Sequence, residues 1–160
     1  MDYEKHVGIA EIKVGHNPSI LTSRGLGSCV AVVLYDPITK IGGMAHILLP
    51  NSGISEKVGN SCKFADRAVE LLLKKLLNLG AKKDNIEAKI AGGAQVFKIP
   101  SKKAFFKIGE QNIAEVRRQL RRLGIKLVAE DVGGNHGRSV HFHLNDGSLH
   151  IKTVWNEKII

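Results

Sequence analysis

The sequence contains little cysteine, proline or aromatic residue, and each scarcity excludes a class of protein. Only 2 of the 160 residues are cysteine, so neither a disulfide scaffold nor a Cys-x-x-Cys zinc or redox motif is present. Four prolines beside 17 glycines indicate tight turns rather than a disordered linker. Aromatic residues make up 5% of the chain, too few for the stacking platforms of single-strand nucleic-acid binders.

The chain also lacks a long apolar run and an excess of acidic residues. No stretch approaches the roughly 18 apolar residues of a membrane span, and no basic start precedes an apolar segment at the N-terminus. We therefore expect a cytoplasmic protein without membrane insertion, in which Cys29 and Cys62 are free thiols. Lysine and arginine outnumber acidic residues by 24 to 15, and the net charge of +9 favours an acidic partner.

The hydrophobic pattern predicts one domain over residues 1–160, built from both helices and strands. Segment 29–35 is β-branched and almost wholly apolar, as in a strand buried on both faces, and we expect a hairpin with segment 41–49. Further strands are predicted at 7–14, 87–90, 125–130, 138–144 and 149–154.

Two helices are predicted, at residues 61–79 and 113–123. The first has Asn60 as a suitable N-cap and Gly80 at its end. The second has Asn112 in the N-cap position and Gly124 at its end. This order of elements predicts an α/β or α+β domain.

Cys29 stands directly after a glycine-rich segment and at the start of the buried strand. Gly25 and Gly27 allow the backbone to direct several N–H groups, including that of Ser28, into one concavity. Such donors stabilise the oxyanion that forms when a thiolate attacks an amide, and one donor contributes roughly 3–4 kcal/mol. The segment therefore offers a nucleophile with an oxyanion or substrate loop.

His46 lies within the apolar segment that we expect to pair with the strand of Cys29. A hairpin would bring the imidazole toward the thiol, where it could act as a general base. The hydroxyls of Thr22, Ser23 and Ser28 are candidates for orienting the ring. The residues alone leave a second interpretation open, in which Cys29 is a small buried hydrophobic residue and His46 a structural one.

Three other features have competing interpretations. Cys62 would lie near a helix N-terminus, which lowers a thiol pKa, but no base or glycine turn is near it in sequence. His141 and His143 alternate on one strand and could bind a metal, or could simply be exposed. Arginines on one face of the second helix suggest either a solvated surface or steering toward an acidic partner: 117, 118, 121 and 122.

Several motifs, taken together and in order, resemble the CheD family of chemoreceptor glutamine deamidases over nearly the whole chain. They are G-L-G-S-C-V (25–30), D-P (36–37), G-G-M-A-H-I-L-L-P-N-S-G (42–53), A-G-G-A (91–94), I-G-E-Q-N-I (108–113) and V-A-E-D-V-G-G-N-H-G-R (128–138).

The resemblance implies a protein-glutamine glutaminase with Cys29 as nucleophile, His46 as base and Ser23 as the third member of a triad. The family usually has threonine at the position of Ser23, and here the threonine is one place earlier, at Thr22. The implied fold is a single-domain α/β/β three-layer sandwich, with mixed sheets and two main helices. The implied partners are the chemoreceptor cytoplasmic domain and a CheC-type phosphatase, with no cofactor, metal or nucleic acid. An alternative is a catalytically weak module that chiefly regulates a CheC-like partner.

Overall fold

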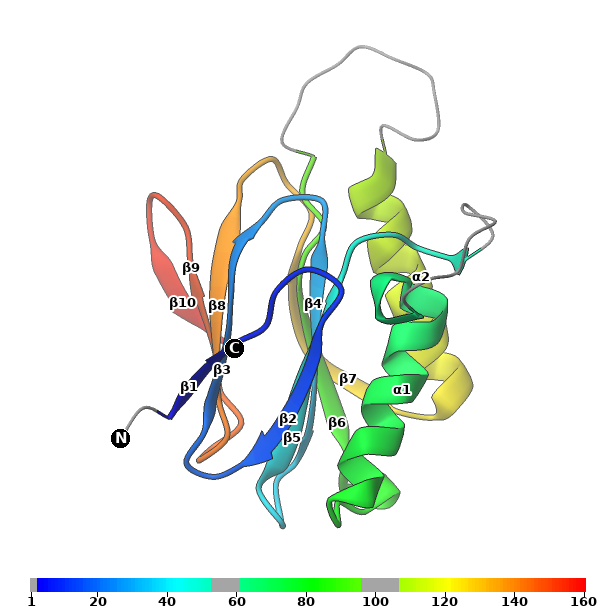
Figure 1. Cartoon of the computed structure of the whole chain (residues 1–160). Coiled ribbons are helices and arrows are strands. Elements are labelled where there is room, and N and C mark those ends of the chain that lie inside the picture. The colour runs from blue at the N-terminus through cyan, green and yellow to red at the C-terminus, as the bar shows by residue number, and fades with distance from the viewer. Residues whose placement is uncertain (1–2, 53–60, 96–106) are drawn as a thin grey trace.

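The structure is a computed structural model that describes residues 3–52, 61–95 and 107–160. Figure 1 shows three layers: two long helices cover one face of a five-stranded sheet, and a second five-stranded sheet covers its other face. Each sheet contains one parallel and several antiparallel pairs, so both are mixed. The three-layer α+β sandwich predicted from the sequence is confirmed.

The middle sheet carries the predicted hairpin at its centre. β4 (Val30–Asp36) pairs antiparallel with β5 (Ile41–Ile47), which confirms that pairing. Every residue of β4 is buried, as its nearly continuous apolar sequence predicted. The remaining strands give the order β2-β5-β4-β6-β7, with bounds β2 (Ile12–His16), β6 (Glu87–Gly92) and β7 (Lys126–Val132).

The outer sheet contains three strands that the sequence pattern did not predict. Its order is β1-β3-β8-β9-β10, with bounds β1 (Glu4–His6), β3 (Ile20–Leu26), β8 (Arg138–His143), β9 (Leu149–Lys152) and β10 (Glu157–Ile159). The prediction did not include β1, β3 or β10. The second half of β3 contains Ser, Arg and Gly, which have little intrinsic strand preference. Its pairing with β8 decides its conformation, while β1 pairs with the first half of the strand.

The prediction of one strand over residues 7–14 is correct only for residues 12–14, which belong to β2. β1 ends at His6 and β2 begins at Ile12, because the chain crosses there from the outer sheet to the middle sheet. Ala10 takes a left-handed φ of 64° within this crossover. Hydrogen bonds fix the crossover to both sheets. The Val7 N–H donates to Thr22 O of the outer sheet, and the Ala10 N–H donates to His46 O of the middle sheet. An apolar segment thus serves as a strap over His46 rather than as a strand.

Both predicted helices are present, with different starts. α1 (Ala65–Asn78) follows a short 3-10 turn at Ser61–Lys63, and the suggested cap Asn60 lies outside the described residues. α2 (Ile108–Leu123) begins five residues earlier than predicted. Asn112 is therefore inside the helix, and its assignment as N-cap is wrong. Gly124 ends α2 in the left-handed conformation, as predicted. None of the helices in the described ranges is long and apolar enough to span a bilayer.

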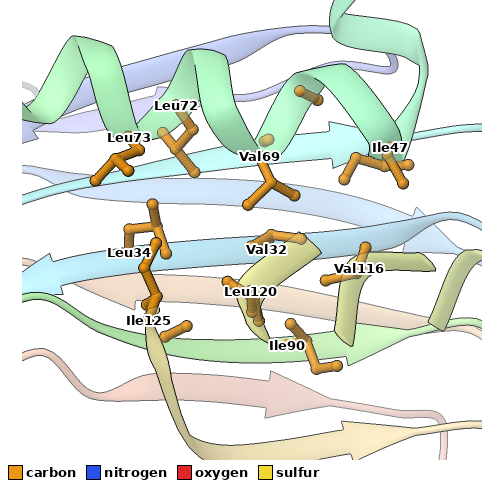
Figure 2. Packing of buried hydrophobic residues seen from close by; sticks show 14 of the residues in the cluster. Val32, Leu34, Ile47, Val69, Leu72, Leu73, Ile90, Val116, Leu120 and Ile125 are labelled. Atoms are coloured by element: carbon orange, nitrogen blue, oxygen red, sulfur yellow. The ribbon is translucent and has the colours of Figure 1, made fainter. Parts of the chain in front are cut away.

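Two apolar cores lie on the two faces of the middle sheet. One fills the space between this sheet and the helices, and Figure 2 shows side chains of α1 and α2 meeting those of β4 to β6. The other lies between the sheets and includes Cys29, Ala31, Met44 and Val140. Side chains alternate along β4, so Val30 faces the helices while Cys29 and Ala31 face the outer sheet. Cys29 therefore lies between the sheets.

Candidate active site

The thiol and the imidazole share one face of the middle sheet. Ala31 is the direct cross-strand partner of His46, and Cys29 precedes Ala31 by two residues. Cross-strand partners and residues two apart point to the same face, so Cys29 and His46 are diagonal neighbours, with Cα atoms about 7–8 Å apart. Side chains at this separation can meet, and the register thus brings together the two residues that the sequence singled out.

His46 is held in one tautomer with a free lone pair. Its Nδ1 lies 3.2 Å from the carbonyl oxygen of Val7, and a carbonyl can only accept, so Nδ1 carries the proton. Nε2 is therefore unprotonated in the neutral ring. It is fully buried and has no hydrogen-bond partner among the described residues. Burial lowers the pKa of His46, and the hydrogen bond to Val7 only partly opposes this effect, so the ring is neutral at pH 7.

Cys29 is also uncharged at rest. Its exposed fraction is 8%, and burial raises the pKa of its thiol, although its own backbone N–H partly offsets this by stabilising the thiolate. A buried thiolate–imidazolium pair would have to lose the hydration of both charges. The resting site thus holds an uncharged thiol and a neutral imidazole on one face of the sheet, without a hydrogen bond from the thiol to the unprotonated Nε2.

Ser23 and Thr22 lie on opposite faces of β3. Ser23 pairs with the core residue Val140 and is fully buried between the sheets, whereas Thr22 pairs with His141 on the outer face. The Ser23 hydroxyl donates to Val7 O at 2.7 Å and also contacts Met44 Sδ at 3.3 Å. Its link to His46 is indirect, because both side chains donate to the same carbonyl of Val7.

The backbone before the thiol is held by donors from two other elements. The carbonyl of Gly27 accepts from Ala94 N at 2.8 Å, and that of Cys29 accepts from Gly93 N at 2.9 Å. The carbonyl between them, of Ser28, accepts from the side chain of Asn112 at 2.9 Å. In a trans peptide the N–H points away from the carbonyl, so the N–H groups of Ser28 and Cys29 are directed away from these donors. Neither N–H is used by the contacts that hold these two peptide units.

Gly25 occupies a different position from Gly27 and Ser28. It lies within β3, with φ of 66°, where the pairing with β8 is interrupted between Ser23 and Leu26. A bulge of this kind bends a strand and redirects its end. Gly25 thus sets the path by which the chain leaves β3 toward Cys29.

Gly92, in the first of two glycine motifs near Cys29, lets the neighbouring backbone approach the Cys29 carbonyl. Gly92 has φ of 112°, and a Cβ there would lie 2.3 Å from the carbonyl oxygen of Cys29. The Gly92 carbonyl in turn accepts from Gly133 N, and the Gly134 carbonyl accepts from Gln95 N, both at 2.9 Å. The A-G-G-A and G-G-N-H-G-R motifs therefore form a backbone network around residues 27–29, the nucleophile loop. Arg138 supports it through Asp131, with Nε 3.3 Å from Oδ2.

We predict that Gly92→Ala changes the reactivity of Cys29 far more than a matched glycine substitution does. Gly124 also has a left-handed φ, 71°, but has no atom within 4 Å of its built Cβ. Both substitutions strain the backbone and should lower the melting temperature. Only Gly92→Ala should displace Cys29, and we expect its alkylation rate by iodoacetamide to change at least about fivefold, since thiol reactivity follows the local environment. Equal rates in the two variants would contradict this.

Sequence reasoning missed two groups at the site. The Val7 carbonyl carries no side-chain signal, so no motif could have revealed it. Asn112 lies within the I-G-E-Q-N-I motif but was interpreted as a helix cap. The buried side-chain atoms without a hydrogen-bond partner in residues 3–52, 61–95 and 107–160 are His46 Nε2 and Asn112 Oδ1. Such atoms are rare in native proteins and require an explanation.

Cys62 and the pair His141 and His143 lie outside the candidate site. Cys62 is partly buried in the short 3-10 turn before α1, and not in the first turn of a long helix. His141 and His143 line a cavity of about 450 Å³ on the outer face of the outer sheet, together with His150 of β9. No group of three or more His, Cys, Asp or Glu side chains in the described ranges is arranged to hold a metal ion.

The basic face of α2 is largely neutralised by the chain itself. Arg117 forms an ion pair with Glu130 of β7, and Arg118 donates to Glu115 one turn earlier at 2.6 and 2.9 Å. Arg122 reaches Glu70 of α1 at 3.3 Å. Exposed pairs of this kind stabilise little, but they reduce the positive charge that this face presents to an acidic partner.

Fold and site together define a two-sheet α+β sandwich with a buried thiol and a buried neutral imidazole on one face of its middle sheet. Residues 48–153 match the family model described as CheD chemotactic sensory transduction. The chain belongs to the CheD family.

Relatives from three bacteria bear the name "Probable chemoreceptor glutamine deamidase CheD". That of Desulfitobacterium hafniense is 48% identical over 155 residues, 96% of each chain. That of Caldanaerobacter subterraneus subsp. tengcongensis is 46% identical over 92% of this chain and 91% of its own. That of Clostridium botulinum is 46% identical over 94% and 93%. Among solved structures, the hypothetical protein YfiH of Bacillus licheniformis matches 75% of this chain and 49% of its own, with TM-score 0.43 and 15% identity.

Proposed function

We propose that the chain, as a single deamidase domain over residues 1–160, is a cytoplasmic protein-glutamine glutaminase that converts chemoreceptor glutamines to glutamates. Cys29 is the nucleophile and His46 the general base. One observation carries the proposal: the buried, unprotonated and unpartnered Nε2 of His46 on the face of the sheet that bears Cys29. The names of the relatives support the choice of substrate.

The proposed reaction uses the imidazole twice. Nε2 of His46 takes the thiol proton of Cys29, and the thiolate attacks the carboxamide carbon of the substrate glutamine. The imidazolium then protonates the departing nitrogen, so that the C–N bond breaks, ammonia leaves and a thioester remains. In the second half Nε2 takes a proton from water, the hydroxide attacks the thioester, and the proton passes to the departing sulfur of Cys29. Glutamate is released and the thiol is restored.

Two backbone donors fit the charge that develops on the carboxamide oxygen. The N–H groups of Ser28 and Cys29 are directed away from the residues that hold their peptide units. The Cys29 N–H also lies beside its own sulfur, where it favours the thiolate. No cofactor or metal takes part in any step.

The direct test is conversion of receptor glutamines by the purified full-length protein. A recombinant chemoreceptor cytoplasmic fragment is incubated with the protein, glutamine-to-glutamate conversion is followed by mass spectrometry, and ammonia release is measured in parallel. The proposal requires both products in equal amounts. Absence of conversion, with and without an added CheC-type phosphatase, would overturn it.

A second candidate function is a binding module that chiefly regulates a CheC-type phosphatase. The burial of Cys29 and its raised thiol pKa favour this reading, because a deeply buried thiol is ordinarily inert. Turnover of receptor glutamines distinguishes the two functions. A protein that binds the phosphatase but converts no receptor glutamine, with or without the phosphatase present, supports the module.

We predict that Ser23→Ala lowers the deamidation rate about fivefold, whereas Thr22→Ala leaves it unchanged. Ser23 fixes the carbonyl of Val7 that orients His46, and one such hydrogen bond contributes about 1 kcal/mol. Thr22 points to the other face of β3 and is the matched control. Ser23→Thr should retain activity. A larger loss in Thr22→Ala than in Ser23→Ala would reverse the assignment of the third residue.

A further inference from the structure

Asn112 of α2 connects the two backbone segments that carry the thiol and the imidazole. Its side-chain Nδ2 donates to Ser28 O at 2.9 Å and to Leu48 O at 3.0 Å, so both amide protons are used. Ser28 directly precedes the nucleophile, and Leu48 follows His46 by two residues. The side chain is fully buried. A single residue, distant from both segments in sequence, thus spans the gap between them.

Close packing at the start of α2 brings Asn112 to this position. A Cβ on Gly109 would lie 2.5 Å from Gly93 O, so the helix backbone touches the end of β6. One turn later, Ile113 rests on Gly93, where an added Cβ would lie 2.5 Å from the Ile113 side chain. Since Gly93 also donates to the Cys29 carbonyl, helix, strand end and nucleophile loop form one contact. The helix cannot shift without moving this loop.

The hydrogen bond to Ser28 sets the direction of an oxyanion donor. The Ser28 carbonyl and the Cys29 N–H belong to one planar peptide unit, so fixing the carbonyl fixes the N–H. Donation to the carbonyl also polarises the unit and strengthens the N–H as a donor. That N–H already favours the thiolate of Cys29. Asn112 thereby acts on the nucleophile through the backbone.

The hydrogen bond to Leu48 acts on the other partner. Leu48 continues the chain of β5 directly past Ile47, and β5 carries His46. Holding Ser28 and Leu48 by one amide group fixes the separation of the two chain ends. The two buried atoms without partners in the described part of the chain, His46 Nε2 and Asn112 Oδ1, belong to the residues of this arrangement.

We propose that Asn112 is a positioning residue for the reaction, which orients the Ser28–Cys29 peptide as an oxyanion donor and holds Cys29 and His46 in register. This inference deepens the proposed function and rests on it. The amide has no role in proton transfer and does not replace any member of the Cys29, His46 and Ser23 set.

Two substitutions at Asn112 and a matched control test the inference. Asn112→Asp keeps the shape but replaces the two donated protons by an oxygen facing two carbonyls. Asn112→Ser is too short to span both carbonyls and buries no charge. Gln119→Glu is the control: Gln119 is a buried amide on the same helix whose side-chain partners are Glu115 and Arg122, away from the site. Melting temperature is measured for all three.

Two readouts separate positioning from folding. The first is kcat and KM on the receptor fragment, where both Asn112 variants should lose about 10- to 100-fold in kcat with little change in KM, less than the 10²–10³-fold loss for deleting an oxyanion donor outright. The second is the pH profile of Cys29 alkylation by iodoacetamide in a Cys62→Ala background, where the Asn112 variants should shift toward higher pH. Gln119→Glu should retain the wild-type values of both.

The inference is overturned if an Asn112 variant melts lower but retains kcat and the alkylation profile. It is equally overturned if Gln119→Glu loses as much, or if neither Asn112 variant folds, because Asn112 then serves the fold alone. Alkylation needs no receptor, so its outcome is independent of the substrate. Failure of the proposed function itself would appear separately, as wild-type protein that does not deamidate the fragment.

Discussion

Replacing Cys29 with alanine abolishes glutamine deamidation and leaves the fold intact. Alanine removes one sulfur atom from a side chain that is already buried between the sheets, so we expect a small loss of stability and a complete loss of covalent catalysis. The remaining oxyanion donors cannot replace the thioester step. Conversion of receptor glutamines, followed by mass spectrometry, should fall to the rate without protein.

Cys62→Ala is the matched control for this prediction. Cys62 is the other thiol of the chain and lies in the short turn before α1. The variant should deamidate at the wild-type rate and should leave one alkylatable thiol. The assignment of the nucleophile is wrong if Cys29→Ala works as well as wild type while Cys62→Ala does not. Loss in both variants, with both folded, would point to a role for Cys62 that the proposed reaction does not contain.

His46→Gln lowers kcat by about 10²–10⁴-fold, the usual contribution of a general base. Glutamine can still donate to the Val7 carbonyl from its amide nitrogen, so the strap over β5 should remain in place. It cannot accept a proton from the thiol. The chosen replacement thus separates base chemistry from packing, and circular dichroism checks that the fold is kept. A variant that retains activity would exclude His46 as the base.

The pH dependence of the wild-type rate distinguishes this mechanism from a preformed ion pair. Burial lowers the pKa of His46 and raises the pKa of Cys29, so thiol and neutral imidazole coexist over a wide range. We expect kcat/KM to be constant at neutral pH. It should fall at a pH below about 6.5, the ordinary pKa of histidine, as His46 is protonated, and at a pH above about 8.5, the ordinary pKa of cysteine, as Cys29 ionises. A preformed thiolate would instead give a Cys29 alkylation rate that is already maximal below neutral pH. His46→Gln should lose the acid limb.

The free energy of unfolding should depend on the same protonation of His46. The folded pKa of His46 lies below its unfolded value, so the unfolded chain binds the proton first as pH falls. The stabilising contribution of the neutral ring is complete above about 6.5 and is lost as pH falls through the folded pKa. His46→Gln has no proton to bind at this position. Its melting temperature should therefore fall less than that of wild type between pH 7 and pH 5.

The sequence predicted elements well where burial alone decides them. β4 and β5 are apolar on both faces and their hairpin follows from a short turn, so pattern and structure agree. β3 shows the opposite case. Its second half has little intrinsic strand preference and is held by β8 at Ser23 and Leu26, while β1 pairs with the first half of the strand. Partners distant in sequence leave no local signal.

The candidate site shows the same difference between its reactive side chains and the groups that orient them. Residue chemistry and motif order singled out Cys29 and His46, because a thiol after a glycine turn and a polar ring in an apolar strand are unusual. The orienting groups were harder to find. The carbonyl of Val7 belongs to a segment whose pattern predicted a strand, and Asn112 was interpreted as a helix cap because its helix was expected to begin five residues later. Both act through the backbone.

By itself the sequence determined which residues are candidates for the proposed chemistry: Cys29, His46 and a hydroxyl near position 23, since reactivity is a property of the side chain. Only the tertiary structure decided how they are arranged. The register of β4 and β5 sets Cys29 diagonal to His46, and the two faces of β3 separate Ser23 from Thr22. The crossover at Val7 fixes the tautomer of the imidazole. Each depends on contacts between segments far apart in the chain, which no local pattern encodes.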